Sequence, residues 1–262
     1  MSTPRILVTG GTGTLGRLVV PQLLAAGAEV RVLSRRLHPH AEADGVRHFA
    51  VDLLAPDGAA GLDAALADVT TVLHLAGGPR GDDEATRTLV AAARRAGGVT
   101  HLVLISVIGA DRMPIGYFRR KLAAEWALSD SGLDWTVLRA AQFHSLTLAT
   151  TRFLAKLPLL PAPGGVRWQP VDPRDVAERL AELALGEPAG LVPDLAGPRT
   201  YTLEELGRGY LSAVGKRRPR LPVRVPGETG RLYRQGANLS PDGQLGKRTW
   251  EDYLAHHVGG RA

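Results

Sequence analysis

The chain has 262 residues, of which 44% are hydrophobic and 22% charged, and it carries a formal net charge of +6 at pH 7. This length and apolar fraction predict one globular unit, or a domain with an elaboration. The absence of cysteine excludes a disulfide scaffold, thiolate zinc sites, iron–sulfur clusters and a cysteine nucleophile. Because charges of both signs are interspersed and the basic runs are short, we interpret the surplus as solvated surface and expect no nucleic-acid partner.

The start of the chain passes directly into an apolar segment and lacks the pattern of a secretory signal. No apolar run approaches the roughly 20 residues that span a bilayer. We therefore expect a cytoplasmic protein without a membrane partner. The sequence leaves the oligomeric state open between a monomer and a homodimer.

The first two-thirds of the chain alternates short apolar segments with alanine-rich helical patterns. The predicted strands are Arg5–Thr9, Glu29–Ser34, Arg47–Val51, Val69–Leu75, His101–Ser106 and Trp135–Arg139. The predicted helices are Gly16–Ala26, Gly58–Ala67, Asp82–Ala96 and Tyr117–Ser131. Strands that are apolar on both faces and separated by helices pair in parallel, with helices covering each face. The pattern predicts an α/β fold of Rossmann type, with a doubly wound parallel sheet.

The regular alternation of predicted strands and helices ends after Ala140, where proline and glycine cluster. Helices are predicted at Pro173–Leu185, Leu203–Val214 and Thr249–His256, and short strands near Val166–Pro170, Asp194–Ala196 and Leu221–Val225. We predict a Rossmann domain over residues 1–145, with 166–186 contributing. Residues 146–262 would form a small, irregular C-terminal lobe over the carboxyl ends of the strands, with a ligand between the two parts.

A glycine-rich loop follows the first predicted strand and opens the first predicted helix. Gly10, Gly13 and Gly16 have the spacing G-x-x-G-x-x-G, which lets the chain approach a pyrophosphate with free N–H groups at a helix N-terminus. The alternative is an ordinary glycine-rich turn. Because strand, loop and helix occur in the required order, we predict that residues 1–145 bind a dinucleotide. The predicted contacts are Gly10, Thr12, Gly13, Thr14, Leu15 and Gly16.

The tip of the second predicted strand indicates which dinucleotide is bound. An enzyme that prefers NAD usually has an acid there, whereas this chain has Ser34, Arg35 and Arg36. Two guanidinium groups and a hydroxyl suit a 2′-phosphate, so NADP is favoured over NAD. The alternative is two surface arginines. Asp52, with Leu53 beside it, is placed to meet the adenine edge, although Asp52 could equally cap a turn.

Tyr117 and Lys121 lie on one face of a predicted helix, because they are four residues apart. An ammonium group near a tyrosine favours the phenolate, so this tyrosine could exchange a proton with a carbonyl or alcohol. Ser106, at the end of a predicted strand, could hydrogen-bond the same oxygen. The alternative makes Tyr117 a packing residue and Lys121 a surface partner of Glu125. Lysine is scarce in this chain, with Lys156, Lys216 and Lys247 as the others, and that scarcity favours a functional Lys121.

Several motifs together resemble the short-chain dehydrogenase/reductase superfamily, in particular its atypical, NmrA-like NAD(P)-binding branch of actinobacterial type. They cover nearly the whole chain. The motifs are Thr9 to Gly16, His74-Leu75-Ala76-Gly77, Ile105-Ser106-Val107-Ile108-Gly109, Tyr117-x-x-x-Lys121-x-x-x-Glu125, Ser131 to Arg139, Val171 to Ala177 and Arg248 to Leu254. Ser106 and Tyr117 are closer in sequence than is usual in the superfamily, which puts their joint action in question.

The resemblance implies a Rossmann fold and assigns roles to individual residues. Lys121 would hold the nicotinamide ribose, Tyr117 would be the acid/base and Ser106 would orient the substrate oxygen. Further cofactor contacts implied by the resemblance are Ala76, Gly77, Gly78, Ala140 and Phe143. Some NmrA-like relatives bind the dinucleotide as sensors and catalyse nothing, but they often lack the tyrosine.

Two residues of the C-terminal third are weaker candidates for substrate contact. His144 follows the sixth predicted strand and could face the substrate, and Trp168 either packs the lobe or touches substrate. No histidine forms a spaced metal-binding pair with nearby carboxylates, so no metal site is expected. No Gly-x-Ser-x-Gly motif is present, which argues against a serine hydrolase.

Together these features predict an NADP-dependent oxidoreductase that moves a hydride between nicotinamide and a small carbonyl or alcohol substrate. Two alternatives use the same binding site. One is a redox sensor that binds NADP and contacts a protein partner. The other is a redox-neutral epimerase, dehydratase or cyclase.

Overall fold

The computed structural model describes residues 3–36, 46–55, 61–78 and 80–258. The chain forms two compact units. The first comprises Met1–Ser106, Arg119–Leu138 and Ala177–Val192, and the second comprises Val107–Phe118, Arg139–Val176 and Pro193–Ala262. The chain therefore passes between the units several times. The predicted separation of cofactor and substrate binding at residue 145 stays a prediction.

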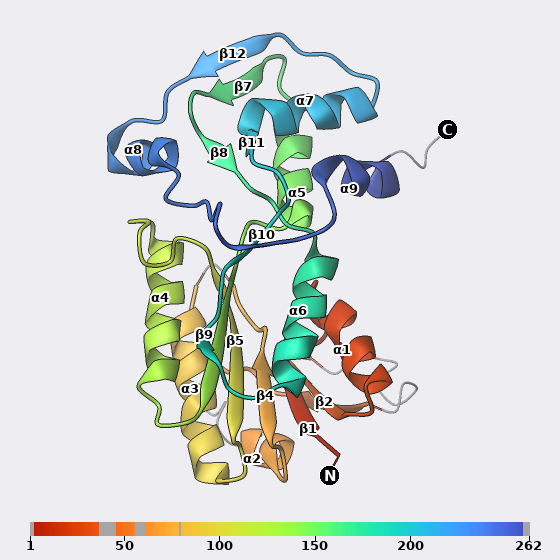
Figure 1. Cartoon of the computed structure of the whole chain (residues 1–262), viewed down its shortest axis with the longest axis vertical. Coiled ribbons are helices and arrows are strands. Elements are labelled where there is room, and N and C mark those ends of the chain that lie inside the picture. Colours follow the sequence, from red (N-terminus) through yellow and green to blue (C-terminus); the bar gives the residue numbers. More distant parts are fainter. Residues whose placement is uncertain (1–2, 37–45, 56–60, 79, 259–262) are drawn as a thin grey trace. The chain divides into compact units, whose positions relative to one another are not determined.

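A parallel sheet forms the centre of the first unit (Figure 1). Its strands are β1 (Arg5–Thr9), β2 (Glu29–Ser34), β3 (Arg47–Ala50), β4 (Thr71–His74), β5 (His101–Val107), β6 (Trp135–Ala140) and β9 (Gly190–Leu191). Their order is β6-β5-β4-β1-β2-β3, and β9 pairs with β6. Leu7 of β1 is in register with Arg31 of β2 and with Val72 of β4, both in parallel. The predicted doubly wound α/β fold is confirmed.

Helices cover both faces of this sheet, with α3 and α4 on one side and α1 and α6 on the other (Figure 1). The helices of this unit are α1 (Gly16–Ala25), α2 (Leu62–Leu66), α3 (Asp82–Ala96), α4 (Gly116–Ser129) and α6 (Pro173–Leu185), of which α4 and α6 each extend into the second unit. Ile6, Leu7 and Val8 of β1 are fully buried, which explains why the strand is apolar on both faces. Burial of one such side chain contributes about 1.5–3 kcal/mol.

The strand order of the first unit contains one reversal of winding. The chain moves outward from β1 through β2 to β3, then restarts at β4 on the other side of β1 and moves outward through β5 to β6. The direction of winding therefore reverses between β1 and β4. In open parallel sheets, ligands bind outside the carboxyl ends of the strands at this reversal.

The second unit is built from short strands and four further helices among the residues that the structure describes. Its elements are α5 (His144–Leu154), β7 (Leu160–Pro163), β8 (Arg167–Trp168), β10 (Leu195–Ala196), β11 (Tyr201–Thr202), α7 (Leu203–Ala213), β12 (Arg220–Val223), α8 (Gly227–Gln235), β13 (Gln244–Leu245) and α9 (Trp250–His257). β7 pairs in parallel with β12, and β8 pairs antiparallel with β11. β10 pairs with β13 and with Ala140 at the end of β6. A small core around Trp250 and Leu206 joins α5, α7 and α9.

The strongly periodic segments have the bounds that the sequence predicts. Four elements match at both ends: Arg5–Thr9, Glu29–Ser34, Asp82–Ala96 and Pro173–Leu185. Several others differ by a residue or two at their ends. The predicted helix over 58–67 is observed as α2 and begins at Leu62, and residues 58–60 lie outside the described part of the chain.

The prediction omitted five elements of the second unit: α5, β7, β11, α8 and β13. α5 is rich in β-branched residues, but the hydroxyls of Thr147 and Thr151 donate to the carbonyls four residues earlier, and one face of the helix is buried. α8 contains Gly230, where a Cβ would lie 2.0 Å from the carbonyl oxygen of Val225, so this glycine allows close packing instead of ending a helix. The proline-rich sequence of β7 predicts an irregular segment, yet this segment pairs with β12 as a strand.

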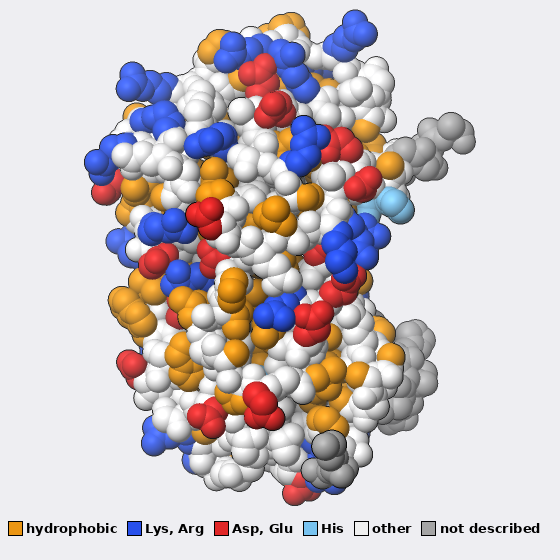
Figure 2. Space-filling model, viewed as in Figure 1, with side chains coloured by type: hydrophobic (Ala, Val, Ile, Leu, Met, Phe, Trp, Pro, Cys, Tyr) orange, Lys and Arg blue, Asp and Glu red, His pale blue; other side chains and the backbone are white. Residues whose placement is uncertain are grey.

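Charged side chains of both signs are interspersed over the face of the molecule in Figure 2. Of the residues described, none forms a helix that is long and apolar enough to cross a membrane.

Candidate functional site

The loop between β1 and α1 requires glycine at its first position. Gly10 has φ +69°, and a Cβ there would lie 2.8 Å from the backbone nitrogen of Ala76. The N–H of Gly10 donates to the carbonyl of Leu33 at 2.9 Å, and its carbonyl accepts from Gly13 at 2.9 Å. The loop is therefore packed against the segment that follows β4 and tied to β2, at the winding reversal.

The start of α1 is arranged to receive an anion. A Cβ on Gly16 would lie 2.3 Å from Cα of Gly11, so the helix can begin this close to the loop only with glycine. The N–H groups of Thr14 and Leu15 make no hydrogen bond to another described residue, and the first turn of α1 contains no acid. Such free N–H groups at a helix N-terminus suit a pyrophosphate. Gly13 and Thr14 are exposed, Thr12 is partly exposed and Leu15 packs inward.

The tip of β2 presents two arginines to solvent. Arg35 and Arg36 are exposed, and neither has an ion-pair partner among the described residues. The hydroxyl of Ser34 donates to the carbonyl of Arg36 at 2.6 Å and closes the turn. Because that hydrogen is used, Ser34 offers a ligand only its acceptor lone pairs. The candidate donors to a 2′-phosphate at this tip are therefore the guanidinium groups.

Asp52 takes the capping role that the sequence offers as one of two alternatives. Its Oδ1 accepts from the N–H of Leu54 at 3.0 Å, which closes a turn after β3. The side chain of Leu53 is 6% exposed and belongs to the core of the first unit. Contact of either residue with adenine stays a prediction.

A directed chain of hydrogen bonds runs beneath the glycine loop. The N–H of Ala76 donates to Oγ1 of Thr9 at 3.1 Å, and Thr9 Oγ1 lies 2.6 Å from Nδ1 of His74. On the other side, Thr86 donates its hydrogen to the carbonyl of Asp82 at 2.7 Å, so it must accept from Nε2 of His74 at 3.2 Å. His74 is thus the tautomer with its proton on Nε2, and it links the end of β1 to the start of α3.

A buried ion pair lies beside this chain. Nζ of Lys121 is 2.9 Å from Oδ2 of Asp82 and donates to the carbonyl of Ile105 at 3.4 Å. The other carboxylate oxygen of Asp82 accepts from the N–H of Gly78 at 2.6 Å. Burial, with a smaller contribution from the Lys121 ammonium, lowers the pKa of His74 to about 3, so this imidazole is neutral at physiological pH. Of His74 and Lys121, only Lys121 therefore brings a positive charge to this buried cluster.

Ser106 and Tyr117 have different surroundings. The buried hydroxyl of Ser106 donates to the buried carboxylate of Glu125. Tyr117 is 37% exposed, and its ring contacts that of Phe118 edge-on at 5.5 Å. It precedes Lys121 by one helical turn of α4. The structure thus pairs Ser106 with a carboxylate that the sequence interpretation considered only as a possible partner of Lys121.

His144 is fully buried in the second unit. Its ring lies 5.8 Å from Trp250 and 5.2 Å from Tyr253, measured between centroids. Its Nδ1 is 3.7 Å from Oδ2 of Asp172, and neither ring nitrogen has a hydrogen-bond partner among the described residues. Burial opposes ionisation of Asp172, but the hydrogen bonds from Arg174, together with the nearby His144 ring, outweigh it and lower the pKa of Asp172. Contact of His144 with substrate stays a prediction.

The other candidates in the second unit are partly or fully packed. Ala140 is 2% exposed, and Phe143 forms an isolated parallel bridge with Val171. Trp168 pairs with Tyr201 across β8 and β11 and packs against the small core of this unit. In the part of the chain that the structure describes, no three His, Asp or Glu side chains are grouped as metal ligands.

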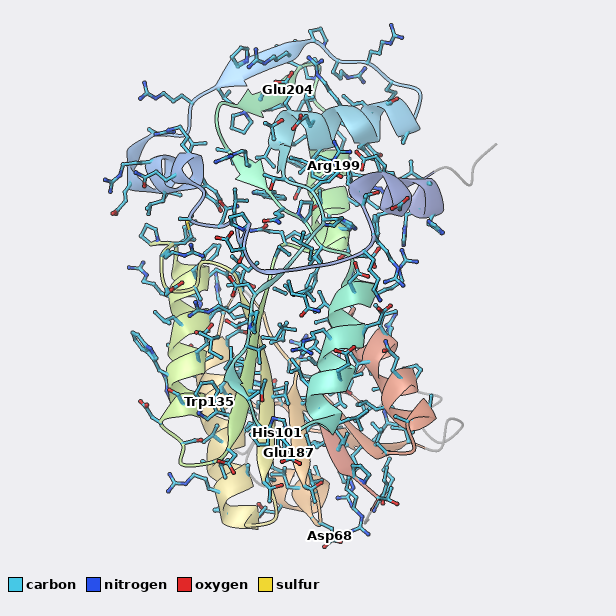
Figure 3. The ribbon with its side chains drawn as sticks, viewed as in Figure 1. Asp68, His101, Trp135, Glu187, Arg199 and Glu204 are labelled. Carbon is cyan, nitrogen blue, oxygen red and sulfur yellow. The ribbon has the colours of Figure 1, made fainter. Side chains whose placement is uncertain are left out.

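His101 shows that a strand histidine need not belong to the site. It begins β5 at the amino-terminal end of the strands, and Glu187, which lies between α6 and β9, is near it (Figure 3). Its Nε2 lies 2.8 Å from Oγ1 of Thr136, and burial lowers its pKa against the opposing effect of Glu187. The glycine loop lies at the other edge, so we interpret His101 as structural.

Sequence reasoning missed Asp82 and Glu125 as parts of the candidate site. Asp82 begins a run of three acids at the start of a helix, which is the normal composition of a helix N-terminus. Glu125 lies on α4 one turn after Lys121, which reads as a surface ion pair. In both cases the useful signal would have been burial, since a carboxylate is rarely buried without a specific partner.

A family model described as NAD(P)H-binding matches residues 10–184. The chain belongs to this family. It is 36% identical over 206 residues to the (4-alkanoyl-5-oxo-2,5-dihydrofuran-3-yl)methyl phosphate reductase of Streptomyces griseus, covering 76% of this chain and 70% of that protein. It is 30% identical to the NAD(P)H azoreductase of Xenophilus azovorans, covering 80% and 74%.

The fold is also similar to solved structures. An NADPH-dependent quinone oxidoreductase of Escherichia coli, complexed with NADPH, superimposes with a TM-score of 0.80 at 21% identity, covering 96% of this chain and 99% of that one. The predicted assignment to NAD(P)-dependent oxidoreductases is confirmed at the level of the family. The finer assignment to the NmrA-like branch stays a prediction.

Proposed function

We propose that this protein catalyses hydride transfer between the nicotinamide of NADP and a small carbonyl or alcohol substrate. The observation that carries the proposal is the position of Lys121 Nζ beside Gly77, one helical turn after the candidate acid Tyr117. The family binds NAD(P)H. Relatives named as a furanone phosphate reductase, an azoreductase and a quinone oxidoreductase support reduction as the direction of the reaction.

The residues at the carboxyl edge of the sheet fit a dinucleotide. The loop from Gly10 to Gly16 would hold the pyrophosphate with its free N–H groups. Arg35 and Arg36 would hold a 2′-phosphate, which supports NADP as the cofactor instead of NAD. When bound, the reduced cofactor supplies the hydride.

The proton of the reaction would pass through Tyr117. In the reductive direction, its hydroxyl donates a proton to the carbonyl oxygen while the carbonyl carbon receives the hydride, so an alcohol forms and Tyr117 is left as phenolate. The phenolate recovers its proton from solvent, which its 37% exposure permits. Lys121 would hold the nicotinamide ribose.

We also propose the NmrA-like branch of the short-chain dehydrogenase/reductases as the closer relationship. The glycine loop is widely shared, whereas the run Ser131-Gly132-Leu133-Asp134-Trp135-Thr136 is more specific to this branch. The quinone, carbonyl and azo compounds reduced by nicotinamide enzymes form the first substrate panel to test.

The test is replacement of Tyr117 by phenylalanine. Consumption of NADPH by the purified protein would be followed at the absorbance of the reduced nicotinamide, and NADPH affinity by calorimetry. We expect Tyr117→Phe to lower turnover about 100-fold or more, as expected for loss of a general acid, while NADPH affinity changes little. Tyr210→Phe in α7 is the matched control and should behave as wild type.

Three results would contradict parts of the proposal. Unchanged turnover in Tyr117→Phe would remove the acid role. NADPH binding without consumption by any substrate, together with capture of a specific protein partner, would identify a sensor. Formation of product without net change in nicotinamide would identify redox-neutral chemistry.

A further inference from the structure

A buried carboxylate lies next to the segment that follows β4. Asp82 is the first residue of α3 and its side chain is 4% exposed, whereas the neighbouring Asp83 pairs with Arg87 on the helix surface. Oδ1 of Asp82 accepts from the N–H of Gly78 at 2.6 Å, and Oδ2 lies 2.9 Å from Nζ of Lys121. The side chain of Asp82 therefore binds both the backbone that follows β4, at Gly78, and the Lys121 ammonium from α4.

This arrangement fixes the direction in which Lys121 can act. An ammonium group has three N–H donors. Asp82 and the carbonyl of Ile105 hold Nζ from two sides, which leaves donor capacity for a ligand oxygen. A Cβ on Gly77 would lie 3.1 Å from this Nζ and 3.4 Å from Oδ1 of Asp82. The backbone thus passes directly against the ion pair, where a side chain would crowd it.

Stability alone does not account for this ion pair. Desolvation of two buried charges offsets much of their attraction, so an apolar pair of similar size would serve packing equally well. Lys121 is the buried member of the four lysines, since Lys156, Lys216 and Lys247 are all exposed. We therefore infer that the pair is kept because the Lys121 ammonium must be held in one place, at the edge of the sheet where the glycine loop lies.

We propose that Asp82 is a positioning residue for the nicotinamide half of the cofactor. It fixes the Lys121 ammonium and the Gly77–Gly78 backbone relative to each other, so that both meet the same ribose. Asp82 itself acts through Lys121 and does not touch the reacting atoms. This inference rests on the proposed function, in which Lys121 holds the nicotinamide ribose.

The first measurement is NADPH affinity of the full-length protein by calorimetry. Asp82→Asn keeps the shape of the side chain but leaves Lys121 without its counter-charge, and we expect affinity to fall about 5- to 100-fold, the range for an unpaired buried charged group. Asp83→Asn removes the same charge from the same helix turn, and we expect no more than a twofold change.

A double-mutant cycle separates positioning from a general loss of structure. If Asp82 acts through Lys121, Asp82→Asn in a Lys121→Met background should have no further effect on NADPH affinity. The cycle also remains informative if Asp82→Asn alone folds poorly, because the double variant carries no unpaired buried charge. Equal losses in both backgrounds would show that Asp82 only supports the loop and would overturn the proposal.

A spectroscopic measurement reports on Lys121 without any reaction. With four lysines in the chain, ¹⁵N spectra of the lysine side-chain ammonium groups contain at most four signals, and Lys121→Met assigns the buried one. We expect that signal to shift or broaden in Asp82→Asn and to stay unchanged in Asp83→Asn. An unmoved signal, or wild-type NADPH affinity in Asp82→Asn, would refute the positioning role. A wild type that binds NADPH but reduces no substrate would instead refute the proposed activity, and the role of Asp82 would still be decided by binding.

Discussion

Replacement of Gly10 by alanine tests whether the glycine loop is built as the structure shows. An alanine at φ +69° costs about 1–2 kcal/mol because the left-handed region brings Cβ close to the following carbonyl. The new Cβ would also lie 2.8 Å from the nitrogen and 2.9 Å from Cα of Ala76. These are backbone atoms, held in part by the hydrogen bond from Ala76 to Thr9, so they yield less easily than a side chain. Overpacking of this kind costs about 1–3 kcal/mol, which gives about 2–5 kcal/mol in total.

Gly27 provides a control that isolates the steric part. It also has a positive φ, +84°, but nothing lies within 4 Å of a Cβ built there. Gly27→Ala should therefore lose only the conformational part, about 1–2 kcal/mol. Urea unfolding of both variants and the wild type, followed by tryptophan fluorescence, gives the free energies of unfolding. The difference between Gly10→Ala and Gly27→Ala measures the contact with Ala76.

The same two variants test whether the loop binds the cofactor. Gly10→Ala displaces either the loop or the segment around Ala76, so NADPH affinity should fall at least about tenfold at a temperature where the variant is folded, as loss of one to two well-placed hydrogen bonds to a charged group would cause. Gly27→Ala should bind as wild type. Equal losses of stability in the two variants would refute the close contact. Wild-type NADPH affinity in Gly10→Ala would refute the loop as the binding site.

Two further predictions concern charge. The double variant Arg35→Ala/Arg36→Ala should weaken NADPH binding about tenfold or more and leave NADH binding nearly unchanged, because only NADPH carries the 2′-phosphate. The control is Arg94→Ala/Arg95→Ala, which removes another pair of neighbouring arginines at the end of α3. Equal losses of NADPH and NADH affinity in Arg35→Ala/Arg36→Ala would contradict the assignment. The folded protein should lose stability as pH falls from about 6.5 towards 3, since unfolded His74 takes up a proton in this range and the folded ring, with a pKa of about 3, does not. His74→Gln should lose less stability over that range in urea unfolding at several pH values, and an unchanged pH dependence would show that His74 is not buried as a neutral ring.

The sequence predicts the first unit well because its signals are local. Strands buried on both faces are continuous apolar runs, and helices between them have regular apolar spacing, so β1, β2 and α3 have the predicted bounds. The second unit depends on contacts between segments far apart in the chain. β7 exists because Leu160 to Pro163 pair with Arg220 to Val223, and no local pattern in a proline-rich segment reveals that partner.

The candidate site shows the same division between local and distant information. The spacing of glycines in the loop, and of Tyr117 and Lys121 on α4, is fixed within one or two turns of chain and is readable from the sequence. The ion pair of Lys121 with Asp82 joins two helices, and the hydrogen bond of Ser106 to Glu125 joins a strand to a helix. Both contacts depend on how α3 and α4 cover one face of the sheet, which spacing along the chain does not specify.

The bond between Ser106 and Glu125 also changes what the candidate site can do. A hydroxyl has one hydrogen, and Ser106 donates it to the carboxylate of Glu125. In this state Ser106 offers a substrate lone pairs and no donor, so it cannot stabilise a developing alkoxide as the resemblance implies. It could instead accept a hydrogen bond from an alcohol substrate or from a bound water. A proton for a carbonyl oxygen would then come from Tyr117 alone, which is why the loss of activity in Tyr117→Phe should greatly exceed that in Ser106→Ala.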